Sequence, residues 1–270
     1  MTGQTESSFK KTWNILAPFL VYFVVHDLAQ VLLAFLMNVS LGLFGGGYTE
    51  FMLANASSVN GVLNALALCI GMASVYPMAR KEFQWAADGG ETAKPAVYAA
   101  LAVFAVSLAL GSNILFTLTG LTASSEAYGE IAAKQYGVAF GVGILVYGIL
   151  SPLAEEIVFR GLIYNRMKRS FRPSLSIIVC GILFGIYHGN LVQGIYGCIL
   201  GIAITFSYEL CGSFFAPVLF HSLANVSVFI AGYDQRILNG MVTVPNCIIF
   251  MTISAAGLFL MVKMRKKQDK

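Results

Sequence analysis

Apolar runs of about 20 residues recur along the whole chain, and each is long enough to cross the roughly 30 Å hydrocarbon core of a bilayer as a helix. The composition agrees, since 57% of the 270 residues are hydrophobic and only 11% are charged. A soluble domain of this size could not bury so much apolar surface. We therefore predict an all-α integral membrane protein, a bundle of about eight transmembrane helices. The expected helices lie near residues 13–37, 57–79, 96–119, 136–164, 174–189, 191–209, 213–231 and 243–262.

The basic residues between these helices predict the orientation of the bundle. If both termini are cytoplasmic, the loops on the other side hold only Lys134 and Arg236, and Arg160 lies within a helix. Such an asymmetry follows the positive-inside rule and favours an even number of crossings. The remaining fourteen basic residues then face the cytoplasm: Lys10, Lys11, Arg80, Lys81, Lys94, Arg166, Lys168, Arg169, Arg172, Lys263, Arg265, Lys266, Lys267 and Lys270.

The chain is expected to form one membrane domain over residues 1–270, because none of its polar stretches is long enough to build a soluble core. The first apolar segment lacks a signal-peptide cleavage pattern and is expected to be a retained helix. Short loops and the lack of an organelle signal favour a multi-pass protein of a bacterial plasma membrane. A basic stripe with interleaved aromatic residues is absent from the sequence, so nucleic acid is not an expected partner. The spacing of Gly194, Gly197 and Gly201 favours close helix packing.

Two adjacent carboxylates and an arginine lie inside the fourth apolar segment, in Ser-Pro-Leu-Ala-Glu155-Glu156-Ile-Val-Phe-Arg160-Gly. An ionised carboxylate at the centre of a membrane helix costs roughly 2.5–3.5 kcal/mol, so such residues face a partner, a cavity or water. At 100° per residue, Arg160 shares a face with Glu156 and points away from Glu155. We therefore expect Arg160 to neutralise Glu156, a structural ion pair. Glu155 has no evident partner within its own helix and is the candidate general base for a water molecule.

The three histidines are the other polar residues of interest within the apolar segments. His188 and His221 follow the acidic pair in later helices, and a rise of 1.5 Å per residue places all of these groups in the cytoplasmic half of the membrane. Asn225 lies one turn after His221 on the same face, so this pair is a candidate to stabilise an oxyanion. His26, beside Asp27, is interpreted as a packing residue.

Three motifs occur in order on successive helices: Glu155-Glu156-x-x-x-Arg160, Phe184-x-x-x-His188 and His221-x-x-x-Asn225. Together they resemble the CPBP family, which comprises the CaaX proteases and the bacteriocin-processing enzymes also called Abi proteins. The resemblance covers about residues 136–231. It implies an intramembrane endopeptidase that hydrolyses a membrane-associated or prenylated CaaX-type peptide.

The resemblance also implies roles for the matching residues. Glu155 corresponds to the catalytic carboxylate and His188 to its partner in activating water, while His221 and Asn225 form the remaining polar wall. Glu156 and Arg160 complete the first motif and are expected to orient it. We also expect Asn190, just past the second motif, to line the site.

Metal dependence stays open at this point. A carboxylate with two histidines is the ligand set of many hydrolytic zinc sites, here Glu155, His188 and His221. The His-Glu-x-x-His spacing of many zinc proteases is absent, however. Members of the family have been described both as metalloproteases and as glutamate-dependent proteases. We favour hydrolysis without a cofactor, in which Glu155 assisted by His188 deprotonates water.

Water and an unfolded substrate backbone are tolerated within a bilayer only where protein or a cavity satisfies them. We therefore expect a polar cavity among the fourth, fifth and seventh helices that opens to the cytoplasm. Two other classes of function compete with the protease. A transporter would use the same residues as a proton relay and should show inverted repeats, of which the sequence gives no convincing sign. An immunity protein or scaffold would bind its peptide without cutting it.

Overall fold

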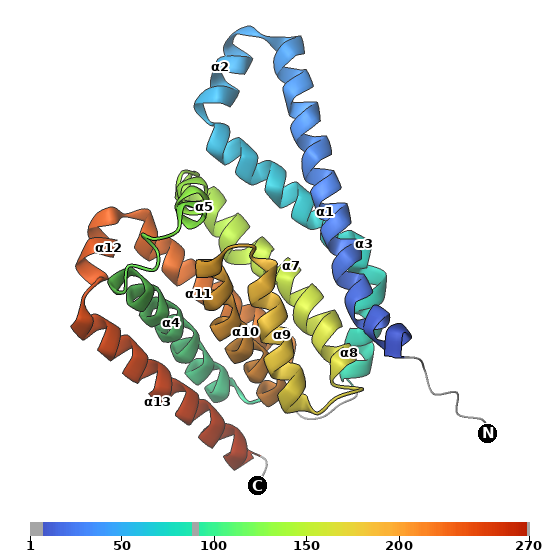
Figure 1. Cartoon of the computed structure of the whole chain (residues 1–270), viewed down its shortest axis with the longest axis vertical. Helices are drawn as coiled ribbons and strands as arrows, with labels where there is room; N and C mark the ends of the chain where they lie inside the picture. The colour runs from blue at the N-terminus through green and yellow to red at the C-terminus, as the bar shows by residue number, and fades with distance from the viewer. Residues whose placement is uncertain (1–7, 88–91, 269–270) are drawn as a thin grey trace, which may run out of the picture.

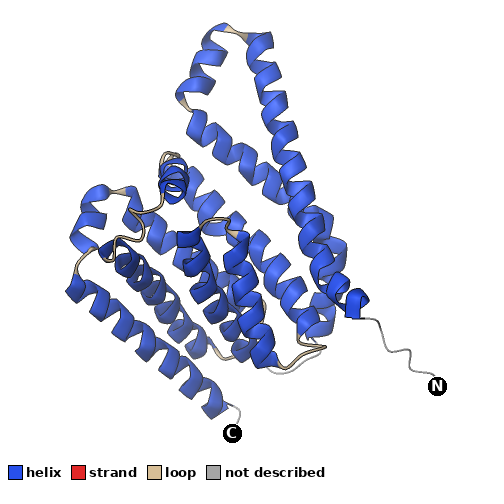
Figure 2. Ribbon diagram, in the orientation of Figure 1, coloured by secondary structure: helices blue, strands red, loops and turns tan. Residues whose placement is uncertain are grey.

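The computed structural model describes residues 8–87 and 92–268, and every regular element within these ranges is a helix (Figure 2). Seven helices are long and apolar enough to cross a membrane. The predicted fold class, an all-α membrane protein, is thus confirmed. The segment predicted near 174–189 forms α9, Pro173–Tyr187, whose 15 residues span only about 22 Å, less than the hydrocarbon core. Eight crossings therefore stay a prediction.

The helices follow one another along the chain with short connections. In order they are α1 (Ser8–Phe44), α2 (Gly46–Ala54), α3 (Ala56–Ala87), α4 (Pro95–Leu118), α5 (Glu126–Tyr136), α6 (Phe140–Gly143), η1 (Ile144–Leu150), α7 (Ser151–Glu156), η2 (Ile157–Tyr164), α8 (Asn165–Met167), α9 (Pro173–Tyr187), α10 (Leu191–Cys211), α11 (Phe215–Tyr233), α12 (Gln235–Met241) and α13 (Val244–Gln268). The elements α6 to α8 form one continuous membrane helix, Phe140–Met167.

This composite helix lies between two packed groups of helices. On one side α1 and α3 form an antiparallel pair that carries α2 at its tip, and on the other α4 packs along α13, and α9 along α10 (Figure 1). The helix α11 contacts both α4 and the composite helix. Large apolar side chains remain exposed on the outer helices, among them Leu28, Val31 and Phe35 of α1 and Phe259 of α13. These surfaces are suited to contact lipid.

One end of the molecule gathers the basic residues. The start of α1, the end of α3, the start of α4, the junctions α8–α9 and α10–α11, and the end of α13 all lie at the lower end of Figure 1, whereas α2, α5 and α12 lie at the upper end. At the lower end Arg166 pairs with Glu82 at 3.0 Å and Lys168 pairs with Glu209 at 3.0 Å. We call this side the basic end. The positive-inside rule predicts that it faces the cytoplasm.

Glycines allow α9 and α10 to approach closely. A Cβ atom at Gly201 would lie 3.0 Å from the Gly181 Cα atom, and one at Gly197 would lie 3.1 Å from the Gly185 Cα atom. These contacts are too short for larger residues, so the predicted packing role of Gly197 and Gly201 is confirmed. At Gly194 a Cβ atom would meet only the Gly185 carbonyl oxygen, at 3.6 Å, an ordinary contact. The close approach holds the end of α9 in place, where His188 lies.

Replacement of Gly185 by alanine should destabilise the protein. The new Cβ atom would lie 2.4 Å from the Gly194 carbonyl oxygen, and overpacking of this kind costs typically about 1–3 kcal/mol. We expect a clear fall in the midpoint of thermal unfolding in detergent micelles. Gly194→Ala is the matched control, since it adds the same methyl group without a clash. Equal midpoints for the two variants would contradict the proposed packing.

Candidate active site

Glu155 and Glu156 end the short helix α7, which lies between two π-helical segments, η1 and η2. Such wide turns are rare and occur frequently at functional sites. In η1 the Tyr147 carbonyl oxygen accepts a hydrogen bond from the Asn225 side-chain amide at 3.0 Å. This bond joins the composite helix to α11. The pattern of apolar residues gave no indication of the π-helical turns, because they change the backbone register without changing the composition.

Glu156 and Arg160 form a fully buried ion pair, as their spacing predicted. The Arg160 Nη1 atom donates to Glu156 Oε1 at 2.7 Å, and both side chains have no exposed surface. Arg160 also donates from Nε to the Thr205 hydroxyl and from Nη2 to the Gly201 carbonyl oxygen, both in α10. Its guanidinium carbon lies 4.7 Å from the centre of the Phe184 ring. The guanidinium is thus held on three sides by residues from other helices.

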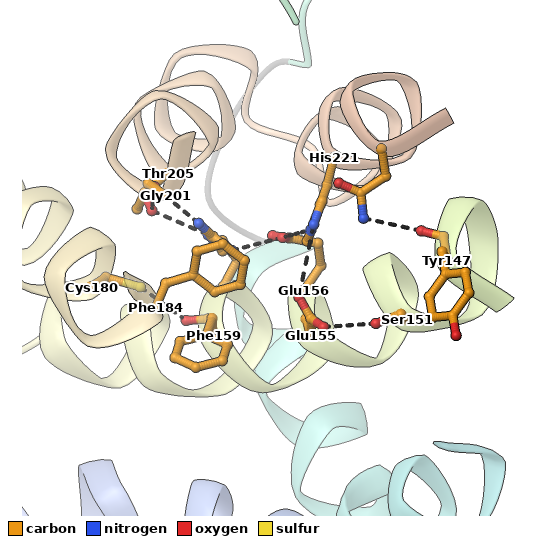
Figure 3. Close-up of polar contacts among 12 residues, drawn as sticks. Tyr147, Ser151, Glu155, Glu156, Phe159, Cys180, Phe184, Gly201, Thr205 and His221 are labelled. Atoms are coloured by element: carbon orange, nitrogen blue, oxygen red, sulfur yellow. Dashed lines mark hydrogen bonds and ion pairs between the residues drawn. The ribbon is translucent and has the colours of Figure 1, made fainter. Parts of the chain in front are cut away.

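His221 connects the two glutamates (Figure 3). Its Nδ1 atom lies 2.7 Å from Glu156 Oε1, the same oxygen that Arg160 contacts, and its Nε2 atom lies 3.8 Å from Glu155 Oε2. A carboxylate accepts, so Nδ1 must be the donor in the shorter contact. The Nε2 atom is then directed towards Glu155. His221 itself is buried, with 4% of its surface exposed.

Glu155 faces a different direction from Glu156, as predicted, and lines a cavity. The expectation that it has no partner within its own helix was wrong. The Ser151 hydroxyl, one turn earlier, donates to Glu155 Oε1 at 2.7 Å (Figure 3). The four-residue spacing of Ser151 and Glu155 places both side chains on the same helix face and could have predicted this hydrogen bond. One carboxylate oxygen is therefore held by Ser151, while the other faces His221.

His188 and Asn225 line the same cavity. The His188 Nδ1 atom lies 2.8 Å from the Phe184 carbonyl oxygen, one turn earlier in α9. Because a carbonyl only accepts, Nδ1 carries the proton in the neutral ring and Nε2 is left as an acceptor. His188 is the cap residue directly after α9, so its ring lies where that helix stops.

Two other predicted positions lie apart from the cavity. Asn190 is not among the described residues that line it, which corrects the prediction. Its side chain instead caps α10 by accepting a hydrogen bond from the Gln193 backbone, and its amide donates to the Gln193 side chain. Gln193, which sequence reasoning missed, does line the cavity. His26 lies in α1, where its Nδ1 atom is 3.0 Å from an Asp27 carboxylate oxygen.

The cavity has a volume of about 240 Å³ and runs through the interior towards α5. The helix α5 lies at the end of the molecule opposite to the basic end (Figure 1), and the predicted opening to the cytoplasm stays a prediction. Apart from Glu155, His188 and His221, the described lining is uncharged and rich in aromatic and aliphatic side chains. It comprises Asn113, Phe116, Thr122, Tyr128, Ile131, Gln135, Tyr136, Tyr147, Ser151, Glu155, Phe184, His188, Val192, Gln193, Tyr196, Gly197, Leu200, His221, Asn225 and Val228.

Two tyrosines of the cavity lie outside the membrane-spanning segments, at the α5 end. Burial raises the pKa of Tyr128 and of Tyr136 above the usual value for a phenol. Both hydroxyls therefore stay protonated at neutral pH and are available as hydrogen-bond donors. Part of the cavity wall is thus polar yet uncharged.

The possible metal ligands do not converge in this structure. Within residues 8–87 and 92–268, no group of three or more histidine, cysteine, aspartate or glutamate side chains is placed to hold a metal ion. The Nδ1 atoms of His188 and His221 face the Phe184 carbonyl oxygen and Glu156, respectively. The Nε2 atom of each ring is still available, and one ring nitrogen is all that a metal takes from a histidine. Glu155, His188 and His221 share a cavity without forming a metal-ligand set.

Comparison with known proteins agrees with this arrangement. Residues 137–227 match the family model described as "Type II CAAX prenyl endopeptidase Rce1-like". Over 140 residues the chain is 24% identical to a protein of Bacillus subtilis (strain 168) described as "Putative membrane peptidase YdiL", a match that covers 45% of this chain and 57% of that protein. No solved structure matches the chain. The matched region contains all three motifs, so the predicted resemblance to the CaaX protease (CPBP) family is confirmed there.

Loss of the Glu156 charge should destabilise the fold. Glu156→Gln leaves the Arg160 guanidinium buried without its anion, and breaking a buried pair in this way costs roughly 3–5 kcal/mol. We expect a large fall in the midpoint of thermal unfolding. Glu209→Gln removes the same charge from a partly exposed pair with Lys168, where the cost is about 0–1 kcal/mol. The argument fails if the two variants unfold at the same temperature.

Proposed function

We propose that this protein is an intramembrane endopeptidase that cleaves a membrane-associated peptide, with Glu155 as the catalytic carboxylate. The observation that carries the proposal is the convergence of Glu155, His188, His221 and Asn225 on one buried cavity. These residues come from three separate segments of the chain. A packing role for any one of them would not require all four to face the same space. The family match supports a peptidase and implies a peptide substrate within a bilayer.

Water activation is assigned to Glu155 and His188. The Ser151 hydrogen bond fixes one oxygen of Glu155, which leaves the other oxygen to take a proton from water. The acceptor Nε2 atom of His188 can orient the same water molecule from the other side of the cavity. The water oxygen then attacks the scissile carbonyl carbon. When the C–N bond breaks, Glu155 can return the proton to the leaving amine nitrogen.

Oxyanion stabilisation is assigned to His221 and Asn225. The Nε2 atom of His221 faces a Glu155 carboxylate oxygen. This orientation is favourable when Nε2 carries a second proton of the ring, because an unprotonated Nε2 and a carboxylate oxygen are both acceptors. A protonated Nε2 is a strong donor to developing negative charge. The Asn225 amide gives one hydrogen to the Tyr147 carbonyl oxygen and has a second one to offer.

The preferred mechanism uses no metal. The supporting observation is that, among the described residues, the three candidate ligands do not converge. The alternative is a zinc-dependent form of the same hydrolysis through Glu155, His188 and His221. We further propose that the protein acts in a bacterial plasma membrane. A prenylated CaaX-type peptide and an unmodified membrane peptide both stand as candidate substrates.

Glu155→Gln should abolish cleavage. The amide has nearly the same shape but cannot accept a proton from water, and general-base assistance is worth typically about 10²–10⁴ in rate. The assay uses purified protein with a fluorogenic prenylated CaaX peptide and a panel of unmodified membrane peptides. Glu50→Gln in α2, remote from the cavity, is the matched control and should cleave normally. Undiminished cleavage by a folded Glu155→Gln variant would refute the assignment.

Chelation distinguishes the two mechanisms. Dialysis of the active protein against a strong chelator should leave its turnover unchanged if Glu155 and His188 activate water without a metal. The measurement is the rate of peptide cleavage before and after dialysis, with and without added zinc. A loss of turnover that zinc restores would instead favour the zinc-dependent alternative.

A further inference from the structure

The C-terminal helix α13 lies at the edge of the bundle and packs mainly along α4 (Figure 1). Its buried residues are Cys247, Ser254, Gly257 and Met261, which recur at helical spacing and form one face. A Cβ atom at Gly257 would lie 3.0 Å from the Phe104 backbone nitrogen, so this face is in close contact with α4. The opposite face of α13 is exposed.

Two polar side chains fix the last turns of α13 to the bundle. The Arg265 Nε atom donates to the Leu210 carbonyl oxygen at 3.0 Å. The Gln268 side-chain amide donates to the Thr92 carbonyl oxygen, and its oxygen accepts from the Lys94 backbone N–H group, both at 2.9 Å. These contacts hold the end of the helix in one orientation. They therefore also determine which side chains face away from the bundle.

Lys263, Lys266 and Lys267 lie on the exposed side of α13. Within residues 8–87 and 92–268 none of them forms an ion pair, whereas basic residues near α8 pair with Glu82 and Glu209. Lys263 and Lys267 are one turn apart, and like charges at this spacing repel each other. The three ammonium groups are therefore suited to share an anion that comes from outside this part of the chain.

These lysines and two apolar residues line a hollow on the outer surface of α13. Its volume is about 440 Å³, and its lining is Phe259, Val262, Lys263, Lys266 and Lys267. At 100° per residue, Phe259, Lys263 and Lys266 fall within about 60° of one another on the helix. Phe259 is 63% exposed, and the Lys263 ammonium lies 5.8 Å from the centre of its ring. A positive charge therefore lies directly beside an exposed aromatic side chain.

The spacing of charge and apolar surface along α13 matches the edge of a bilayer. At 1.5 Å per residue, Lys263 lies roughly 6 Å beyond Phe259 along the helix axis and Lys267 roughly 12 Å beyond it. One headgroup layer is about 5–7 Å thick. With Phe259 in the hydrocarbon, the lysines therefore reach the headgroups. A ligand that fits the hollow must carry an apolar chain and, a few ångströms away, a negative charge.

We propose that this hollow binds the phosphate of an anionic phospholipid, with an acyl chain against Phe259 and Val262. Lysines next to a membrane helix attract anionic headgroups. A zwitterionic lipid is a poorer ligand, because its own ammonium group would be repelled by the lysines. The described lining of the Glu155 cavity includes no residue of α13. The lipid site is therefore separate from the candidate active site and goes beyond the proposed peptidase function.

A tryptophan in the hollow can report which lipid occupies it. Phe259→Trp is made in a background in which Trp13 and Trp85 are replaced by phenylalanine. The protein is reconstituted into bilayers of phosphatidylcholine and phosphatidylglycerol, with bromine on the acyl chains of one lipid at a time, because bromine quenches tryptophan fluorescence on contact. We expect phosphatidylglycerol to bind beside the tryptophan about tenfold or more tightly than phosphatidylcholine.

Removal of two lysines should abolish most of this preference. Each lysine near an anionic surface contributes about a fivefold gain in affinity, so Lys263→Gln with Lys266→Gln should lower the preference roughly tenfold or more. The matched control is Lys11→Gln with Lys81→Gln, which removes two exposed lysines from α1 and α3, on the opposite side of the molecule (Figure 1). The control should keep the full preference.

Three results would overturn the lipid site. Equal quenching by the two brominated lipids would show ordinary contact with the bilayer. Quenching by neither lipid would show that protein, such as a second copy of this chain, covers the hollow. An equal loss of preference in the two double variants would show a diffuse attraction of the basic end rather than a site. Peptide cleavage enters none of these measurements, so they are independent of the proposed function.

Discussion

The buried contact of Glu156 with both Arg160 and His221 is the interaction on which the site depends. One carboxylate oxygen lies 2.7 Å from each partner, so a single anion orients a guanidinium and an imidazole at once. Arg160 in turn contacts Thr205 and Gly201 of α10. Three helical segments therefore meet at one charge within the membrane. Because ions without partners are very costly in this environment, the arrangement admits few alternatives.

Neighbouring residues of one helix thereby acquire different tasks. Glu156 is neutralised and fully buried, whereas Glu155, one residue earlier, faces the cavity and accepts a hydrogen bond from Ser151. The rotation of 100° between successive residues separates them. The first carboxylate stays available for chemistry, and the second fixes the histidine beside it. The Glu-Glu pair is thus better understood as one reactive group and one structural group than as two equivalent acids.

Charged residues are distributed unevenly between the two ends of the molecule. Basic residues and their ion pairs close one end, while the cavity and its uncharged lining extend towards α5 at the other. The short helix α9 contributes to this asymmetry, because it ends at Tyr187 and His188 follows directly as its cap. Close glycine contacts with α10 hold that end in position. Helix length and backbone packing therefore place the histidine as much as its own hydrogen bond does.

The sequence by itself determined the all-α membrane class, the Glu156–Arg160 pair and four residues of the cavity wall: Glu155, His188, His221 and Asn225. These follow from apolar length and from helical spacing, which are local and need no knowledge of neighbouring helices. Only the tertiary structure decided that His221 contacts Glu156 and that Gln193 replaces Asn190 in the lining. It also showed that the cavity extends towards α5. Contacts between helices depend on their tilt, register and π-helical turns, and a linear pattern of residues does not encode these distances.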